Sequence, residues 1–215
     1  MDLHHQLDNY CERVGPEFWS EPLNAVTNAA FLIAALAAYL MWRRKTPDDW
    51  AGLSLIVILA AIGIGSFLFH TFATVWAVLA DVIPIVIFIH VYLFFALNRY
   101  LKLPWWAALG IVIAFFAATP FVADAVFAPF VGGSASYVPA LLAIFVVGAL
   151  LFRENQGLGR QVLLIGVVFL VSLTIRTLDE PLCGHVEFGI HFMWHILNSI
   201  VLFLLIRVLI LHRAG

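Results

Sequence analysis

The chain has 215 residues, of which 64% are apolar and 11% charged, against roughly 45–50% and about 25% in an ordinary soluble domain. No water-soluble fold could bury this share of apolar side chains, so the composition excludes a soluble globular protein. The formal net charge of -2 and the lack of a dense basic run argue against nucleic-acid binding. We therefore expect the partners of this chain in the lipid bilayer.

The first twenty residues are polar and acidic. They lack the basic start and short apolar core of a cleavable signal peptide. We expect residues 1–21 to be retained as a segment on the outer side of a membrane.

Apolar runs recur along the rest of the chain, each long enough for the ~20 residues that a helix needs to cross a bilayer. The strict alternation of a barrel strand is missing, which favours helices. The segment 123–135, with its Gly, Ser and Asp content, is predicted to be a loop, and no repeat or long linker divides the chain. Residues 1–215 are thus predicted to be one all-α domain, a seven-helix transmembrane bundle with spans near 22–42, 52–70, 78–97, 104–122, 136–152, 161–177 and 187–210.

The basic residues predict the orientation of this bundle. If the spans alternate, only Arg13 and Arg176 lie on the side of the N-terminus. The positive-inside rule then places the N-terminus outside and the C-terminus in the cytosol. The cytosolic side carries the other Lys and Arg residues: Arg43, Arg44, Lys45, Arg99, Lys102, Arg153, Arg160, Arg207 and Arg213.

Ionisable side chains inside the predicted spans gather toward the outer side. His191 and His195 are four residues apart, so both rings leave one face of a helix. Ser66 and His70 share that offset, and Asp81 follows across a short outer turn. Three neutral imidazoles are the ligands of a catalytic zinc with an open fourth position, beside which Asp81 could orient or deprotonate water. A histidine pair in an apolar helix can equally serve helix–helix hydrogen bonding, so the spacing alone leaves both interpretations open.

Acidic residues crowd the segment before the first span. Asp8, Glu12 and Glu21 offer the hard oxygen ligands that suit Ca²⁺. The alternative is a solvated acidic cap with aromatic anchors at the membrane interface.

Three blocks of the sequence resemble the alkaline ceramidase family, within a wider superfamily of membrane hydrolases. The short cytosolic loops and the compact length favour a bacterial member. The three blocks follow the family's order along the chain and combine S-x3-H, a downstream Asp and H-x3-H. The blocks are 10-YCERVGPEFWSEPLNAVTN-28, 63-GIGSFLFHTFATVWAVLADVIPI-85, and 179-DEPLC-183 with 191-HFMWHILN-198.

The resemblance implies a seven-helix fold with zinc held by three histidines, an active site completed by a serine and an aspartate, and a calcium site near the N-terminus. It also implies that two cysteines lie near each other, and we expect a disulfide between them on the oxidising outer side. Mapped onto this chain, these residues are His70, His191 and His195 for zinc, Ser66 and Asp81 for catalysis, Asp8, Glu12 and Glu21 for calcium, and Cys11 and Cys183 for the disulfide.

The expected activity is metal-assisted hydrolysis of the amide bond of ceramide, giving a fatty acid and a sphingoid base, with the site toward the outer face of the cell membrane if the source is bacterial. One alternative is a hydrolase of the same superfamily that acts on another lipid amide or ester. Another is a seven-helix receptor or transporter in which the histidines form a proton relay or a structural metal site. The sequence carries no signal for an oligomeric state.

Overall fold

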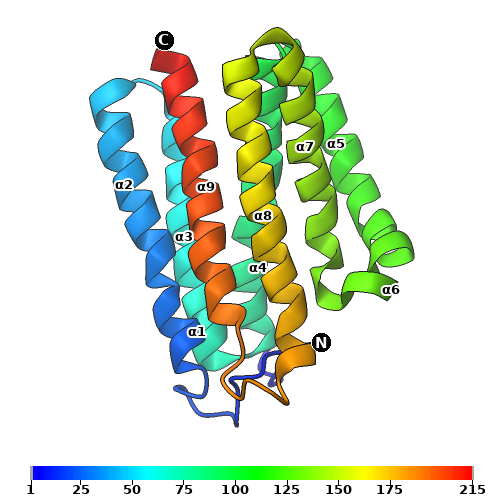
Figure 1. The fold of residues 1–215 in the computed structure, drawn as a ribbon. Coiled ribbons are helices and arrows are strands. Elements are labelled where there is room, and N and C mark those ends of the chain that lie inside the picture. The colour runs from blue at the N-terminus through cyan, green and yellow to red at the C-terminus, as the bar shows by residue number, and fades with distance from the viewer. Residues whose placement is uncertain (1, 215) are drawn as a thin grey trace.

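The computed structural model describes residues 2–214 as a bundle of long helices without a β-strand (Figure 1). Three further segments are short helical turns: η1 (Ala96–Tyr100) and η2 (Ala123–Phe127) are π-helical, and η3 (Gly132–Tyr137) is a 3₁₀ helix. The α-helices are α1 (Pro22–Thr27), α2 (Ala29–Lys45), α3 (Trp50–Phe72), α4 (Val75–Phe95), α5 (Trp105–Val122), α6 (Ala128–Val131), α7 (Val138–Glu154), α8 (Gln156–Leu182) and α9 (His191–Ala214).

Six helical segments of the described chain are long and apolar enough to cross a membrane, so the prediction of an all-α membrane protein is confirmed to this extent. One of them, Trp105–Glu154, is 50 residues long and as a straight helix would measure about 75 Å, more than twice the hydrocarbon thickness. It includes both α5 and α7, which line one groove together with α4. The six segments are Pro22–Lys45, Trp50–Phe72, Val75–Tyr100, Trp105–Glu154, Gln156–Leu182 and His191–Arg213.

The connection between α5 and α7 corrects the prediction of a loop over residues 123–135. It consists of the successive helical turns η2, α6 and η3. A proline in the first turn of α6 and Gly132, with φ of 49°, set the start and end of that helix. Helical turns satisfy backbone N–H and C=O groups locally, which an irregular loop at membrane depth could not do.

The crossing of α3 and α4 is the closest approach between two helices near the polar residues. A Cβ atom added to Gly65 would lie 2.0 Å from the carbonyl oxygen of Ala80, so only a glycine allows the two backbones to meet there. Ser66 and Asp81 are the residues that follow these two along the chain. The crossing therefore brings Ser66 and Asp81 to the same level of the bundle.

One end of the bundle is covered by the N-terminal segment and by the connection between α8 and α9, while the C-terminus lies at the other end (Figure 1). The N-terminal segment runs antiparallel to the turn between α3 and α4: the amide of Leu7 donates to the carbonyl of Ala73 over 2.7 Å, and the amide of Val75 donates to that of His5 over 3.2 Å. This cover lies over the end of α3 and the start of α9.

Candidate metal centre

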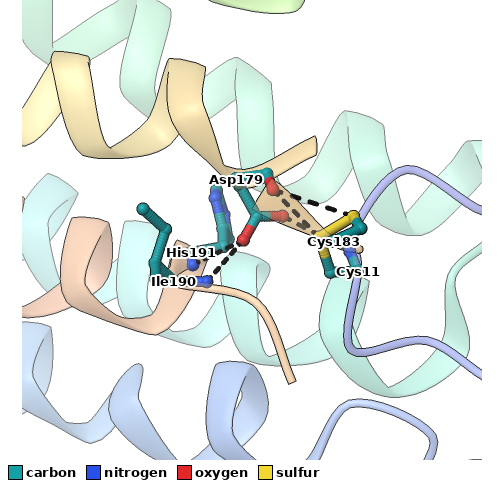
Figure 2. Close-up of a disulfide and its surroundings, with 5 residues drawn as sticks. All are labelled: Cys11, Asp179, Cys183, Ile190 and His191. Atoms are coloured by element: carbon teal, nitrogen blue, oxygen red, sulfur yellow. Dashed lines mark hydrogen bonds between the residues drawn. A yellow bond between two sulfur atoms is a disulfide. The ribbon is translucent and has the colours of Figure 1, made fainter. Parts of the chain in front are cut away.

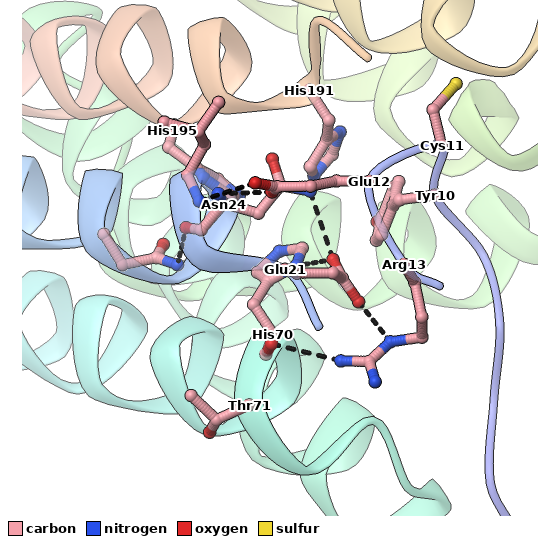
Figure 3. A network of polar contacts seen from close by, with 12 residues as sticks. Tyr10, Cys11, Glu12, Arg13, Glu21, Asn24, His70, Thr71, His191 and His195 are labelled. Atoms are coloured by element: carbon pink, nitrogen blue, oxygen red, sulfur yellow. Dashed lines mark hydrogen bonds and ion pairs between the residues drawn. The ribbon is translucent and has the colours of Figure 1, made fainter. Parts of the chain in front are cut away.

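Three histidines meet beneath the N-terminal segment. His70 lies in the last turn of α3, whereas His191 and His195 occupy successive turns at the start of α9. One ligand atom from each ring lies within 4.8 Å of the others, and all three side chains are buried (Figure 3). The structure thus brings together the three histidines that the sequence spacing indicated, and they could hold a metal ion.

Hydrogen bonds orient two of the rings. Nδ1 of His70 meets the carboxylate of Glu21, the residue before α1. Nδ1 of His195 lies 3.0 Å from the hydroxyl of Thr27, which donates its own proton to the carbonyl of Leu23 over 2.7 Å. Because the Thr27 hydroxyl has a single proton, Nδ1 of His195 must donate to it, and the lone pair of that ring is left on Nε2.

The free ring nitrogens fit a metal. Nε2 of His195 and Nδ1 of His191 are buried and have no hydrogen-bond partner among the described residues. A buried nitrogen without a partner costs about 1–3 kcal/mol, whereas coordination of a cation satisfies it. The donor set of three neutral imidazoles is that of a catalytic rather than a closed structural site.

Ser66 and Asp81 lie beside this cluster. Ser66 is buried one helical turn before His70 on α3. The carboxylate of Asp81 lies near the Ser66 hydroxyl and within electrostatic range of His70 and of Arg176. One of its oxygens, Oδ1, is buried without a protein partner. A carboxylate oxygen with no donor next to a candidate metal site is placed to accept a proton.

A buried Arg–Glu pair forms the layer between the histidines and the N-terminal segment. Arg13 donates through Nε to Glu21, through Nη1 to the carbonyl of Gly15 over 2.8 Å, and through Nη2 to that of His70 over 3.1 Å (Figure 3). Burial alone would raise the pKa of the Glu21 carboxyl, but the His70 ring and the Arg13 guanidinium bring that pKa below its ordinary value. Glu21 is therefore an anion that supports the candidate ligand His70.

The acids predicted to bind calcium do not form a common site in the described structure, whose one cluster of potential ligands is the histidine group. The carboxylate of Glu12 accepts the backbone N–H groups of Leu23 and Asn24 over 2.7 and 2.8 Å, and its burial raises its pKa. Glu21 is engaged by Arg13, and Asp8 is exposed. The calcium site stays a prediction that this arrangement does not support, because a guanidinium occupies the side of Glu21 that faces away from the histidines.

Tyr10 lies over the histidine cluster, at the end of the bundle that the N-terminal segment covers. Its ring stacks on that of His191, with a centroid separation of 3.8 Å, and burial raises the pKa of its hydroxyl above the ordinary value. This ring shields one face of a candidate ligand from water.

Asp179 of α8 holds the start of α9. Its Oδ1 accepts the backbone N–H of Ile190 over 2.6 Å and that of His191 over 2.9 Å, and its Oδ2 accepts the N–H of Cys11 over 3.3 Å (Figure 2). A carboxylate at a helix N-terminus satisfies amides that lack partners within the helix. Asp179 thereby ties the helix that carries two of the histidines to α8 and to the N-terminal segment.

A disulfide strengthens the same junction. Cys11 and Cys183 are joined with a Cα–Cα distance of 5.2 Å, and no free cysteine remains in the chain. The bridge links residues 172 positions apart. The N-terminal segment that carries Tyr10, Glu12 and Arg13 is thus covalently attached to the end of α8.

Sequence reasoning missed Arg13, Tyr10, Thr27 and Asp179 as parts of the site. A signal existed for the first of them, because Arg13 and Arg176 are the two basic residues on an otherwise acidic face. The others show no periodic pattern, although all of them lie within the blocks that carry the family resemblance.

Two cavities adjoin the centre. A narrow apolar cavity runs from Ile62 and Asn198, near the histidines, to Tyr92 and Tyr100 near the opposite end of the bundle. A polar cavity of about 710 Å³ lies beside the disulfide and is lined by Tyr10, Ser134, Arg176 and Glu180 among others.

The family model described as Ceramidase matches residues 8–215, nearly the whole chain. No curated protein matches the chain.

Proposed function

The chain belongs to the ceramidase family, and from this premise we propose that it is a zinc-dependent membrane hydrolase that cleaves the N-acyl bond of ceramide to a fatty acid and a sphingoid base. The observation that carries the proposal is the cluster of three buried histidines with unpartnered ring nitrogens beside a carboxylate. A Lewis acid next to a base is one combination that can hydrolyse an amide.

His70, His191 and His195 would hold the zinc ion. When bound, zinc supplies Lewis acidity, which polarises a carbonyl group and lowers the pKa of water toward about 7. Calcium is not part of the proposal, because Ca²⁺ takes six to eight oxygen ligands and the carboxylates of Glu12 and Glu21 already bind protein donors.

Asp81 and Ser66 have separate roles. The Oδ1 atom of Asp81 has no protein partner, so it is free to take a proton from the attacking water and later to give it to the leaving amine. The Ser66 hydroxyl would donate a hydrogen bond to the carbonyl oxygen as negative charge develops there. Losing one such donor typically lowers the rate by about 10²–10³.

The apolar cavity supports a lipid substrate. It begins one turn from Ser66, at Ile62, and three residues after His195, at Asn198. Its other lining residues are almost all apolar or aromatic and come from α4, η1, α5, η3, α7, α8 and α9. The acyl chain would lie in this cavity and place its amide at the histidines.

The membrane topology of the proposal has seven crossings, with the N-terminus outside and the C-terminus in the cytosol. Two crossings, α5 and α7, come from the 50-residue segment Trp105–Glu154. The histidine centre then lies near the outer face of the cell membrane. The basic residues support this orientation, because nine of the eleven lie in the half of the bundle away from the centre.

The test measures fatty-acid release from ceramide and from a phospholipid with the same acyl chain. The purified unchanged protein and the variant His195→Ala are assayed in parallel. We expect fatty acid from ceramide with the unchanged chain only. Release from the phospholipid alone would point to the other lipid hydrolase. Protein purified without a chelator that lacks near-stoichiometric zinc would contradict every hydrolytic function and favour the receptor or transporter.

A further inference from the structure

Arg176 of α8 is a cation that the proposed reaction does not use. Nη1 donates to the Ser134 hydroxyl over 2.8 Å, and Nη2 donates to the Tyr10 hydroxyl over 3.4 Å. The guanidinium carbon lies 5.1 Å from the ring centre of Tyr137 and 5.8 Å from that of Trp194. All of these partners are neutral, and no carboxylate oxygen of residues 2–214 forms a salt bridge with Arg176.

The guanidinium therefore has donors to spare. It carries five N–H groups, of which the protein engages one on each Nη atom. No described residue accepts a hydrogen bond from its Nε, and this atom is not fully buried, so it can face the space that Arg176 lines. A cation at membrane depth that forms no salt bridge is expensive and usually marks a functional site.

The free space is the polar cavity of about 710 Å³. Arg176 lines its inner side with Tyr10, whose ring stacks on the candidate ligand His191. On its other side Arg176 contacts Tyr137, which lines the apolar cavity. Arg176 thus lies where the polar cavity, the apolar cavity and the histidine centre meet.

The other charged residues of the polar cavity are acids. Asp8 and Glu180 are exposed at its rim, and Asp179 is buried with its oxygens bound to backbone N–H groups. These acidic residues repel an anionic group and accept hydrogen bonds from hydroxyls or from an amine. The single guanidinium supplies donors for hydroxyl oxygens.

We propose that Arg176 is a specificity-determining residue that donates hydrogen bonds to neutral hydroxyl groups of the substrate's head, which the polar cavity holds on the amine side of the scissile amide. This inference rests on the proposed function and adds the residue and the cavity that would select the head of the substrate, which is hydroxylated and uncharged, over one with an anionic phosphate. The acyl chain would extend the other way, past Tyr137 into the apolar cavity.

The first experiment compares three N-acyl substrates with one acyl chain: a long-chain amino-diol amide, a plain long-chain alkyl amide, and the amino-diol amide phosphorylated on its terminal hydroxyl. The variants are Arg176→Gln, Arg176→Lys and a control, Arg153→Gln, whose side chain is exposed at the opposite end of α7. Zinc content is measured for each to verify an intact centre.

With the unchanged chain we expect the amino-diol amide to be the best substrate of the three. Arg176→Gln should lower kcat/KM for it about 10- to 100-fold, the usual effect of losing a hydrogen bond to a charged group, while leaving the alkyl amide unchanged. Arg176→Lys should be intermediate because lysine offers a point charge and not a fork of donors, and Arg153→Gln should be neutral.

Several results would overturn the inference. An equal loss on the amino-diol and alkyl amides would assign Arg176 to the reaction centre or to stability. Preference of the unchanged chain for the phosphorylated lipid would make the cavity an anion site. Equal use of the two neutral amides would remove head-group selection but leave the amide hydrolase standing.

A binding measurement tests the inference even without turnover. A long-chain 2-amino-1,3-diol should raise the Tm of the zinc-loaded protein more than an alkylamine of equal length does. The difference should disappear in Arg176→Gln and persist in Arg153→Gln. Equal shifts in the unchanged chain would contradict the role of Arg176, whereas lack of amide cleavage with unequal shifts would contradict the proposed reaction alone.

Discussion

The carboxylate of Glu21 is hydrogen-bonded to Nδ1 of His70, although the two residues lie 49 positions apart, one just before α1 and the other in the last turn of α3. Arg13 donates to the same carboxylate, so Arg13, Glu21 and the candidate ligand His70 form one chain of contacts. Partners of this kind fix the tautomer and direction of a ligating histidine.

Replacing Glu21 by glutamine should weaken zinc binding about 10- to 100-fold, the usual effect of losing such a support. The amount of zinc that each variant retains during titration with a chelator measures this loss of affinity. Glu17→Gln is the control, because Glu17 is exposed in the same segment and bonds only to Ser20. Equal retention by the two variants would remove Glu21 from the support of the metal.

Substitutions of the histidines and of Asp81 should differ in their effects on bound zinc and on activity. His191→Ala or His195→Ala should abolish both bound zinc and activity, whereas Asp81→Asn should abolish activity and keep most of the zinc. Elemental analysis with a turnover assay distinguishes them. His90→Ala is the control, since the His90 ring bonds to the Val86 carbonyl of its own helix over 2.7 Å. Zinc loss in Asp81→Asn equal to that in the histidine variants would make Asp81 a ligand.

The disulfide should contribute strongly to stability, because the bridge spans 172 positions and a loop of about 100 residues already corresponds to about 4.7 kcal/mol in the chain-entropy view. The double variant Cys11→Ser with Cys183→Ser should have a lower Tm in detergent. Protein denatured without reductant should show no reactive thiol. Two thiols per chain in that assay would exclude the bridge.

Gly65→Ala should separate α3 from α4, because the new Cβ would lie 2.0 Å from the Ala80 carbonyl oxygen. Overpacking of this kind typically costs about 1–3 kcal/mol, and it would also displace Ser66 from Asp81. We expect a lower Tm together with lower activity. Gly110→Ala on α5 is the matched control, since a Cβ there meets no atom within 4 Å, and unchanged behaviour of both variants would contradict the close crossing.

Asp179→Ala should destabilise the start of α9 by about 0.5–2 kcal/mol, the usual effect of losing a helix cap. Zinc affinity should fall as well, because the carboxylate binds the backbone of His191. Asp179→Asn keeps one oxygen acceptor and should lose less stability and less zinc affinity than Asp179→Ala. Thermal unfolding and chelator titration measure the two effects, with the exposed neighbour Glu180→Ala as the control, and a loss in that control as large as in Asp179→Ala would contradict a specific cap.

The candidate ligands could be predicted because their signal is local. His191 and His195 are one helical turn apart, and the offset of Ser66 from His70 repeats that spacing. The turn between α3 and α4 then accounts for Asp81. The prediction of a calcium site used residue type and the family resemblance, and neither could show that Arg13 would pair with Glu21.

The sequence by itself determined an all-helical membrane protein and the end of the bundle where its acids and histidines gather, because hydropathy, the spacing within a helix and the position of basic residues are properties of the chain read in order. Only the tertiary structure decided which side chains support the histidines and which cation faces the polar cavity. The Thr27 contact with His195 joins residues 168 positions apart, and the Arg176 contact with Tyr10 joins residues 166 apart. Such contacts depend on how the helices pack, and no periodicity along the chain records that packing.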